Sequence, residues 1–299
     1  INAGTLLVSG NGSLANNSSA GITVNNGGTF SFGKQDLFGG HTSSVSTPIT
    51  INAGGFVTNN GTFFNRLGNI TIAGGTLTSA NGFTQAGLDG PLAWALAGTV
   101  TVSGDTQSTI SGTGNVMLGS GASVTGTTFD VSNGAAATDL FISAKLINSS
   151  SNSWGTAQAS TLTKNGAGTL SLSAANSYTG LTTINAGTLR LGIAGTSTNT
   201  PLGTTAAGTA ISAGGTLDLN GYTLGTAEAL TLNGKGVGNN GALINSSTDT
   251  LATYSGAVTL GSASYIGGPG SLTISGAIGA GSLAFVNSGT FDLTSTNNA

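Results

Sequence analysis

Cysteine is absent from the 299-residue chain. Its absence excludes disulfide bonds, thiolate zinc sites and cysteine nucleophiles. Long hydrophobic runs are missing as well, since no stretch approaches the roughly 18 apolar residues that a membrane-spanning helix needs. We therefore expect no membrane insertion of this segment.

Charge is scarce: only 5% of the residues are charged, against roughly 25% in ordinary soluble domains. Six Lys and Arg residues are too few to neutralise a phosphate backbone, so we expect no nucleic-acid partner. Disorder is disfavoured because 37% of the residues are hydrophobic and the net charge is only −3. A buried core is therefore expected beneath a surface of Ser, Thr, Asn and Gly.

A short repeat runs through the chain: glycine, then threonine, then Leu, Phe or Val. Polar and apolar residues alternate after it, as in Thr169–Leu172 and Thr188–Leu191, which is the period of a half-buried strand. The repeat begins at Gly4, Gly28, Gly61, Gly75, Gly98, Gly168, Gly187, Gly215 and Gly289.

Several of these repeats are 19, 23, 24 or 28 residues apart. Such spacing fits one coil of a three-strand solenoid, with glycines at the sharp corners and asparagines stacked in ladders. We therefore predict an all-β fold: a right-handed parallel β-helix (β-solenoid) with roughly three short strands per coil and about 12–15 coils. One continuous solenoid should span residues 1–299.

A longer repeat is also visible, because Ile1–Leu6 is identical in sequence to Ile184–Leu189. The tail at Gly289–Asn297 parallels Gly168–Asn176, after which seven residues lead to Ile184. We interpret the chain as two pseudo-repeat units, about 1–183 and 184–299, within an excerpt of a longer tandem array.

The segment from Lys164 to Leu189 resembles the autotransporter-associated β-strand repeat, also called the passenger-associated transport repeat. The resemblance implies a parallel β-helical passenger at the surface of a bacterium or outside it, in which the repeat aids secretion and folding. The matching motif residues, which we expect to be structural, are Gly166, Gly168, Thr169, Leu170, Leu172, Asn176, Tyr178, Gly180, Ile184, Asn185, Gly187, Thr188 and Leu189.

Carboxylates are candidate catalytic groups because parallel β-helices also carry polysaccharide-degrading enzymes. Asp218 and Asp292 occupy matching outward strand positions and could form an acid pair, but a solvated face is favoured. Asp105, Asp130 and Asp139 could hold Ca²⁺, although caps of turns are favoured. We expect no catalytic residue, no metal site and no cofactor.

Aromatic residues and the single histidine offer few contacts. Trp94 lies in an apolar stretch and is expected in the core, while Tyr178 is expected to close a corner. His41 and Trp154 lie in polar loops, so they are the candidates for surface contact, although a lone loop histidine is usually only solvated.

The sequence favours a non-catalytic role. Neither terminus carries a charged, helical or proline-rich cap, so coils are expected to continue end to end, by head-to-tail or lateral self-association. The favoured function is a bacterial cell-surface fibre, sheath or filament. An adhesin passenger that binds host or surface glycans is the alternative, and a polysaccharide-degrading β-helix enzyme follows it.

Overall fold

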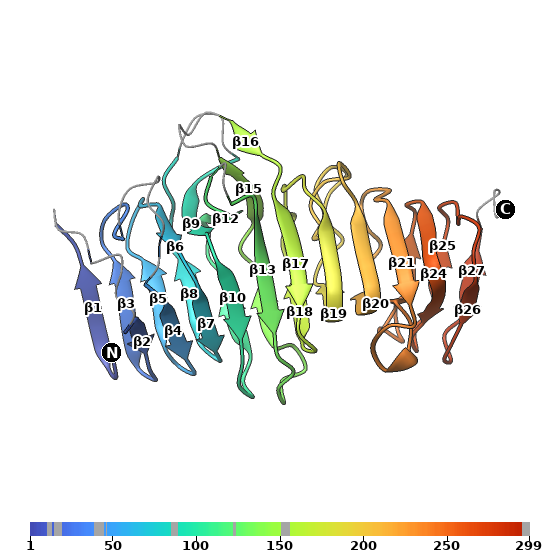
Figure 1. The fold of residues 1–299 in the computed structure, drawn as a ribbon, viewed down its shortest axis with the longest axis horizontal. Helices are drawn as coiled ribbons and strands as arrows, with labels where there is room; N and C mark the ends of the chain where they lie inside the picture. Colours follow the sequence, from blue (N-terminus) through green and yellow to red (C-terminus); the bar gives the residue numbers. More distant parts are fainter. Residues whose placement is uncertain are drawn as a thin grey trace.

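The computed structural model describes residues 1–10, 14, 20–38, 45, 47–84, 89–121, 124–150 and 156–294. Short parallel strands stack along one long axis, and the two ends of the chain lie at opposite ends of the molecule (Figure 1). The expected all-β parallel solenoid is thereby confirmed. No helix in the described part of the chain is long and apolar enough to cross a membrane.

The first face of the solenoid is a ladder of twelve parallel strands or half-strands. Its successive partners are 19 to 33 residues apart, as between Leu170 and Leu189 or Thr76 and Thr109. In order, the ladder consists of β1 (Gly4–Val8), β3 (Gly28–Phe32), β5 (Phe56–Asn59), β8 (Thr76–Ser79), β11 (Ser108–Ile110), β14 (Leu140–Ile142), β18 (Thr169–Leu172), the second halves of β19 (Thr182–Leu191) and β20 (Thr209–Asp218), β22 (Leu243–Ile244), the second half of β24 (Val258–Gly267) and β26 (Leu283–Phe285).

The second face is built in the same way, and β19, β20 and β24 bend across the corner to serve both faces. For this reason β19 is one continuous strand from Thr182 to Leu191, and its two halves pair on different faces. The other strands of this face are β2 (Ile22–Val24), β4 (Ile49–Asn52), β7 (Ile70–Ala73), β10 (Thr99–Val102), β13 (Gly126–Val131), β17 (Thr161–Asn165) and β21 (Leu230–Gly234).

The third face is less regular and is divided between two smaller sheets. One contains β6 (Asn65–Leu67), β9 (Leu92–Leu96), β12 (Asn115–Leu118) and β15 (Leu146–Ser150), with β16 (Ala157–Gln158) antiparallel to β15. The other contains β23 (Ala252–Tyr254), β25 (Leu272–Ile274) and β27 (Phe291–Leu293), and a short 3-10 helix, η1, covers Val237–Asn239.

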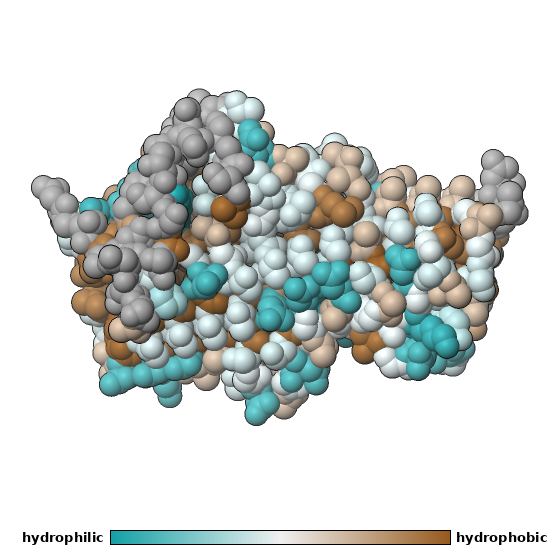
Figure 2. Space-filling model, viewed as in Figure 1, coloured by the Kyte–Doolittle hydropathy of each residue, from teal (hydrophilic) through white to brown (hydrophobic). Residues whose placement is uncertain are grey.

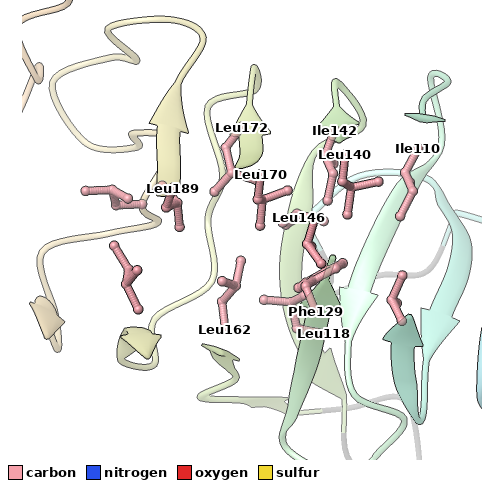
Figure 3. Close-up of a cluster of buried hydrophobic side chains, with 14 of the residues drawn as sticks. Ile110, Leu118, Phe129, Leu140, Ile142, Leu146, Leu162, Leu170, Leu172 and Leu189 are labelled. Atoms are coloured by element: carbon pink, nitrogen blue, oxygen red, sulfur yellow. The ribbon is translucent and has the colours of Figure 1, made fainter. Parts of the chain in front are cut away.

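The core is a column of apolar side chains that follows the axis between the faces. Figure 3 shows the side chains of Leu140, Leu170 and Leu189 stacked from coil to coil, and all three are fully buried. Burying one such side chain contributes about 1.5–3 kcal/mol. The alternating sequence therefore drives the coiling, because only stacked coils can hide its apolar face.

A second apolar cluster lies on the outer side of the third face, around Phe64, Leu92, Ala95, Met117 and Ile147. It explains the continuous apolar run of β9, because strands buried on both sides lose the polar alternation.

The glycine-threonine repeat marks the first face at six of its nine positions, but not at Gly61, Gly98 or Gly289. Gly289 precedes β27, which pairs with β25 on the third face. The segment of similar sequence after Gly168 forms β18, which lies on the first face. Similarity between the tail and Gly168–Asn176 therefore does not correspond to equivalent positions in the coil.

The expected asparagine ladder is present at the corner before the first face. Asn25 Nδ2 donates to Asn2 Oδ1 at 2.7 Å, and Asn52 Nδ2 donates to Asn25 Oδ1 at 2.6 Å. These bonds join three successive coils through identical side chains, as in the ladders of stacked β-structures.

Candidate functional site

The motif coil begins with β17 and turns into β18 through Asn165–Gly168. Gly166 takes a left-handed φ of 74°, and a Cβ on Gly168 would lie 2.7 Å from the Asp139 carboxylate. A larger residue at either position would strain the backbone or collide with the preceding coil. The two motif glycines therefore shape the corner.

Lys164 points into this corner and is fully buried. Its Nζ donates to the carbonyl oxygens of Asn165 at 2.8 Å, Gly166 at 2.7 Å and Ala186 at 3.1 Å. Burial lowers the pKa of Lys164 to about 8, although the charges of Asp130 and Asp139 oppose the shift. The ammonium group thus satisfies the carbonyls of two consecutive turns.

The motif coil has no strand on the third face, and the side chain of Asn176 makes the hydrogen bonds to the neighbouring coils there. Its Oδ1 accepts from Leu146 N at 2.8 Å, and its Nδ2 donates to Pro201 O at 2.6 Å. The side chain therefore joins the preceding coil to the following one. It is 1% exposed, so both bonds are protected from water.

Tyr178 closes the corner that leads to β19, but from inside the core. Its ring is fully buried, and its hydroxyl lies 2.7 Å from Thr182 Oγ1. Burial raises the pKa of this phenol above its usual range, with a further contribution from Glu228. Gly180 follows, where a Cβ would collide with Ser160 O and where the amide donates to that same oxygen.

The second turn of the motif coil stacks directly on the first. Gly187 has φ 66°, and a Cβ there would lie 2.5 Å from the carbonyl oxygens of both Gly166 and Gly168. Asn185 Nδ2 donates to Asn165 Oδ1 at 2.9 Å, which makes a second ladder. Thr169, Leu170, Leu172, Ile184, Thr188 and Leu189 complete the stack as paired strand residues.

The three clustered aspartates form no shared group among the described residues, where no set of three potential metal ligands lies together. Asp139 accepts from Gly134 N at 2.8 Å and from Thr169 N at 2.7 Å. It therefore caps turns of two coils, the interpretation that the sequence favoured. Asp105 and Asp130 are exposed.

Asp218 corrects the prediction of a solvated face. It is fully buried, its Oδ2 pairs with Arg190 Nε at 2.8 Å, and its Oδ1 accepts from Asn220 N and Ser246 N. The alternation placed it outward, but the turns of the next coil fold over it. Asp292 lies on β27 of the third face, so the two carboxylates are not equivalent.

Of the aromatic predictions, the one for Trp94 is confirmed. Trp94 is fully buried, and its ring meets Phe32 edge-on with centroids 5.1 Å apart. His41 and Trp154, the candidates for surface contact, lie outside the described residues.

Lys164, which binds the corner carbonyls, and Glu228 are buried ionisable residues that the motifs of the sequence do not identify. Both occupy the inward phase of the alternation, two residues from Leu162 and Leu230 respectively. The period-two pattern alone could therefore have identified them. Glu228 is fully buried, and burial raises its pKa to about 7.

The family model for the passenger-associated-transport repeat matches residues 162–191. No curated protein and no solved structure matches the chain. The matched range runs from β17 through β19, and Lys164, Asn176 and Gly187 connect this coil to its neighbours. This coil is therefore similar to the passenger-associated-transport repeat, and it lies within a parallel β-solenoid.

Proposed function

We propose that this solenoid is a structural segment of a bacterial cell-surface fibre, extended by the stacking of one coil end on another. The transport repeat supports an autotransporter passenger, and thus a secreted or surface location. Stiffness follows from the first face, where twelve consecutive rungs pair in parallel without an interruption in their order.

The observation that carries the proposal is the contrast between two identical hexapeptides. Ile184–Leu189 lies between the coils of β18 and β20, and its Leu189 is fully buried. Ile1–Leu6 pairs with the coil of β3, and its Leu6 is 48% exposed. A further coil on β1 would bury Leu6 as β18 helps to bury Leu189.

Apolar exposure recurs at the other end of the described segment, where Phe285 and Leu293 are exposed and Phe285 packs on Phe291 with centroids 5.1 Å apart. Figure 2 shows brown side chains at the end that carries β1, against a mostly pale lateral surface. Such a distribution favours stacking at the ends over a charged or catalytic side surface.

Negative-stain electron microscopy over a concentration series tests the proposal. We expect wild-type protein to form rods that lengthen with concentration, and Leu6→Lys to remain as single rods because a buried lysine would oppose stacking. Leu251→Lys is the matched control, since Leu251 is 55% exposed but does not lie on an end strand.

Single wild-type rods at every concentration would contradict end-to-end stacking. So would filaments of unchanged length from Leu6→Lys. Binding of such single rods to neutral glycans would instead support the adhesin alternative.

A further inference from the structure

Glu228 is the only glutamate of the chain, and it lies where a charge is least expected. It precedes β21 and has no exposed surface. The next coil closes over it, because a Cβ on Gly256 would collide with the Glu228 carbonyl oxygen. The same carbonyl accepts from Tyr254 Oη at 2.8 Å.

The carboxyl group of Glu228 faces hydroxyls. Thr209 Oγ1 donates to Oε1 at 2.6 Å, and Thr200 Oγ1 lies 3.5 Å from Oε2. The single proton of Thr200 is also within reach of Gly203 O, at 3.2 Å. A carboxylate has about four acceptor positions, so these two hydroxyls leave it poorly satisfied.

Protonation of the Glu228 carboxylate would give each polar atom of this cluster a hydrogen-bond partner. A protonated Oε2 can donate to Thr200 Oγ1, which leaves the Thr200 proton free to bond Gly203 O, while Thr209 still donates to Oε1. Every polar atom of the cluster then has a partner, which a buried network requires.

The surroundings provide no compensating charge. The titratable groups on which the charge of Glu228 acts are the phenols of Tyr178 and Tyr254, and both have raised pKa values. No positive charge among the described residues contributes to the pKa of Glu228, which burial raises and the two threonine hydroxyls lower. An ionised Glu228 would thus be a buried, uncompensated charge.

The turn at residues 200–203 connects this carboxyl group to the transport repeat. Asn176 Nδ2 donates to Pro201 O at 2.6 Å, and Thr182 Oγ1, the partner of Tyr178, donates to Leu202 O at 3.2 Å. One side of the turn is therefore held by Asn176 and Thr182 of the matched repeat and the other by Glu228.

We propose that the Glu228 carboxyl group is a pH-sensitive latch, which fastens the 200–203 turn to its neighbouring coils when protonated and loosens it when ionised. The solenoid next to the transport repeat is then tight in mildly acidic surroundings and opens locally above neutral pH. This device depends on the buried cluster and not on filament formation.

The single glutamate makes a direct test possible. In protein labelled with [5-¹³C]glutamate, one carboxyl resonance should titrate with a midpoint near 7. Hydrogen exchange measured by mass spectrometry, corrected for intrinsic rates, should show at least a tenfold loss of protection in residues 199–210 and 229–232 between pH 5.5 and 8.5.

Glu228→Gln should abolish this loss of protection, and Asp249→Asn, a change at an exposed acid, should preserve it. Thr209→Val removes the hydroxyl that lowers the pKa, so the midpoint should move to higher pH. A midpoint below 5 would overturn the proposal, as would protection that does not change with pH. If Glu228→Gln fails to fold, the wild-type resonance and Thr209→Val still decide between these outcomes.

Discussion

Lys164 is joined to the following coil through Ala186, whose carbonyl oxygen accepts a hydrogen bond from the Lys164 ammonium group at 3.1 Å. The bond connects the two glycine turns of the transport repeat from within. A lysine in the core is unusual, since buried charges need strong partners. Three backbone carbonyls supply them here.

Lys164→Met should change how stability depends on pH. The folded-state pKa of about 8 is below the ordinary 10.5, so the unfolded chain binds more protons between these values. Wild-type stability should therefore rise between pH 8 and 10.5, by about 3 kcal/mol relative to Lys164→Met. Urea unfolding of both proteins at pH 7, 8, 9 and 10.5 measures this difference, and parallel profiles would refute the burial of a charged lysine.

Asn176→Asp should destabilise the protein by about 2–4 kcal/mol at pH 7, because the carboxylate cannot donate to Pro201 O and would be buried. Asn239→Asp, at an exposed position, is the control and should be nearly neutral. Thermal unfolding of both variants gives the comparison. Equal effects would mean that Asn176 does not connect the coils.

The stability losses of Gly187→Ala and Gly27→Ala, taken together, separate the cost of steric crowding from the cost of backbone strain. Both glycines have positive φ, but only Gly187 has backbone oxygens where the methyl group would lie. We expect Gly27→Ala to cost about 1–2 kcal/mol from its φ alone, and Gly187→Ala to cost clearly more. Similar losses in chemical denaturation would show that the coils do not approach as closely as described.

Arg190→Met should cost about 3 kcal/mol, because it leaves the buried Asp218 carboxylate without its ion-pair partner. The double variant Arg190→Met with Asp218→Asn should recover part of this loss, because it removes the charge that was left unpaired. A double-mutant cycle by urea unfolding measures the coupling. Strictly additive losses would mean that the pair does not interact.

Most of the fold could be predicted because one local rule repeats. Alternation after each glycine–threonine pair gave the strands, and the spacing of the pairs gave the coils. The rule fails at two places: Gly289 precedes a strand of the third face, and β9 is apolar on both sides because a second apolar cluster covers its outer side. Neither departure shows as a period in the sequence.

The candidate site was predictable only in part. The glycines and Tyr178 were expected at corners, and they lie there, whereas Asn176 was expected only to be structural and joins two coils across the third face. Asp218 was misplaced because alternation tells which way a side chain points, not what later folds over it. Lys164 and Glu228 were overlooked because their charge suggested the surface, although their phase in the strand indicated the core.

Successive coils of the solenoid stack in parallel, one rung at a time. Thr99, Thr128, Thr163, Thr183, Ala210, Thr231 and Thr259 are consecutive partners on the second face. Because the chain has no cysteine, spin labels can be placed at Thr99 and Thr259 alone and their separation measured by pulsed electron paramagnetic resonance.

Six rungs separate these two residues, which predicts a backbone separation of about 29 Å at ~4.8 Å per rung. Moving the first label to Thr128 should shorten the distance by about one rung, ~4.8 Å. An unchanged distance after the label is moved, or a broad distance distribution for both label pairs, would contradict the stacked solenoid.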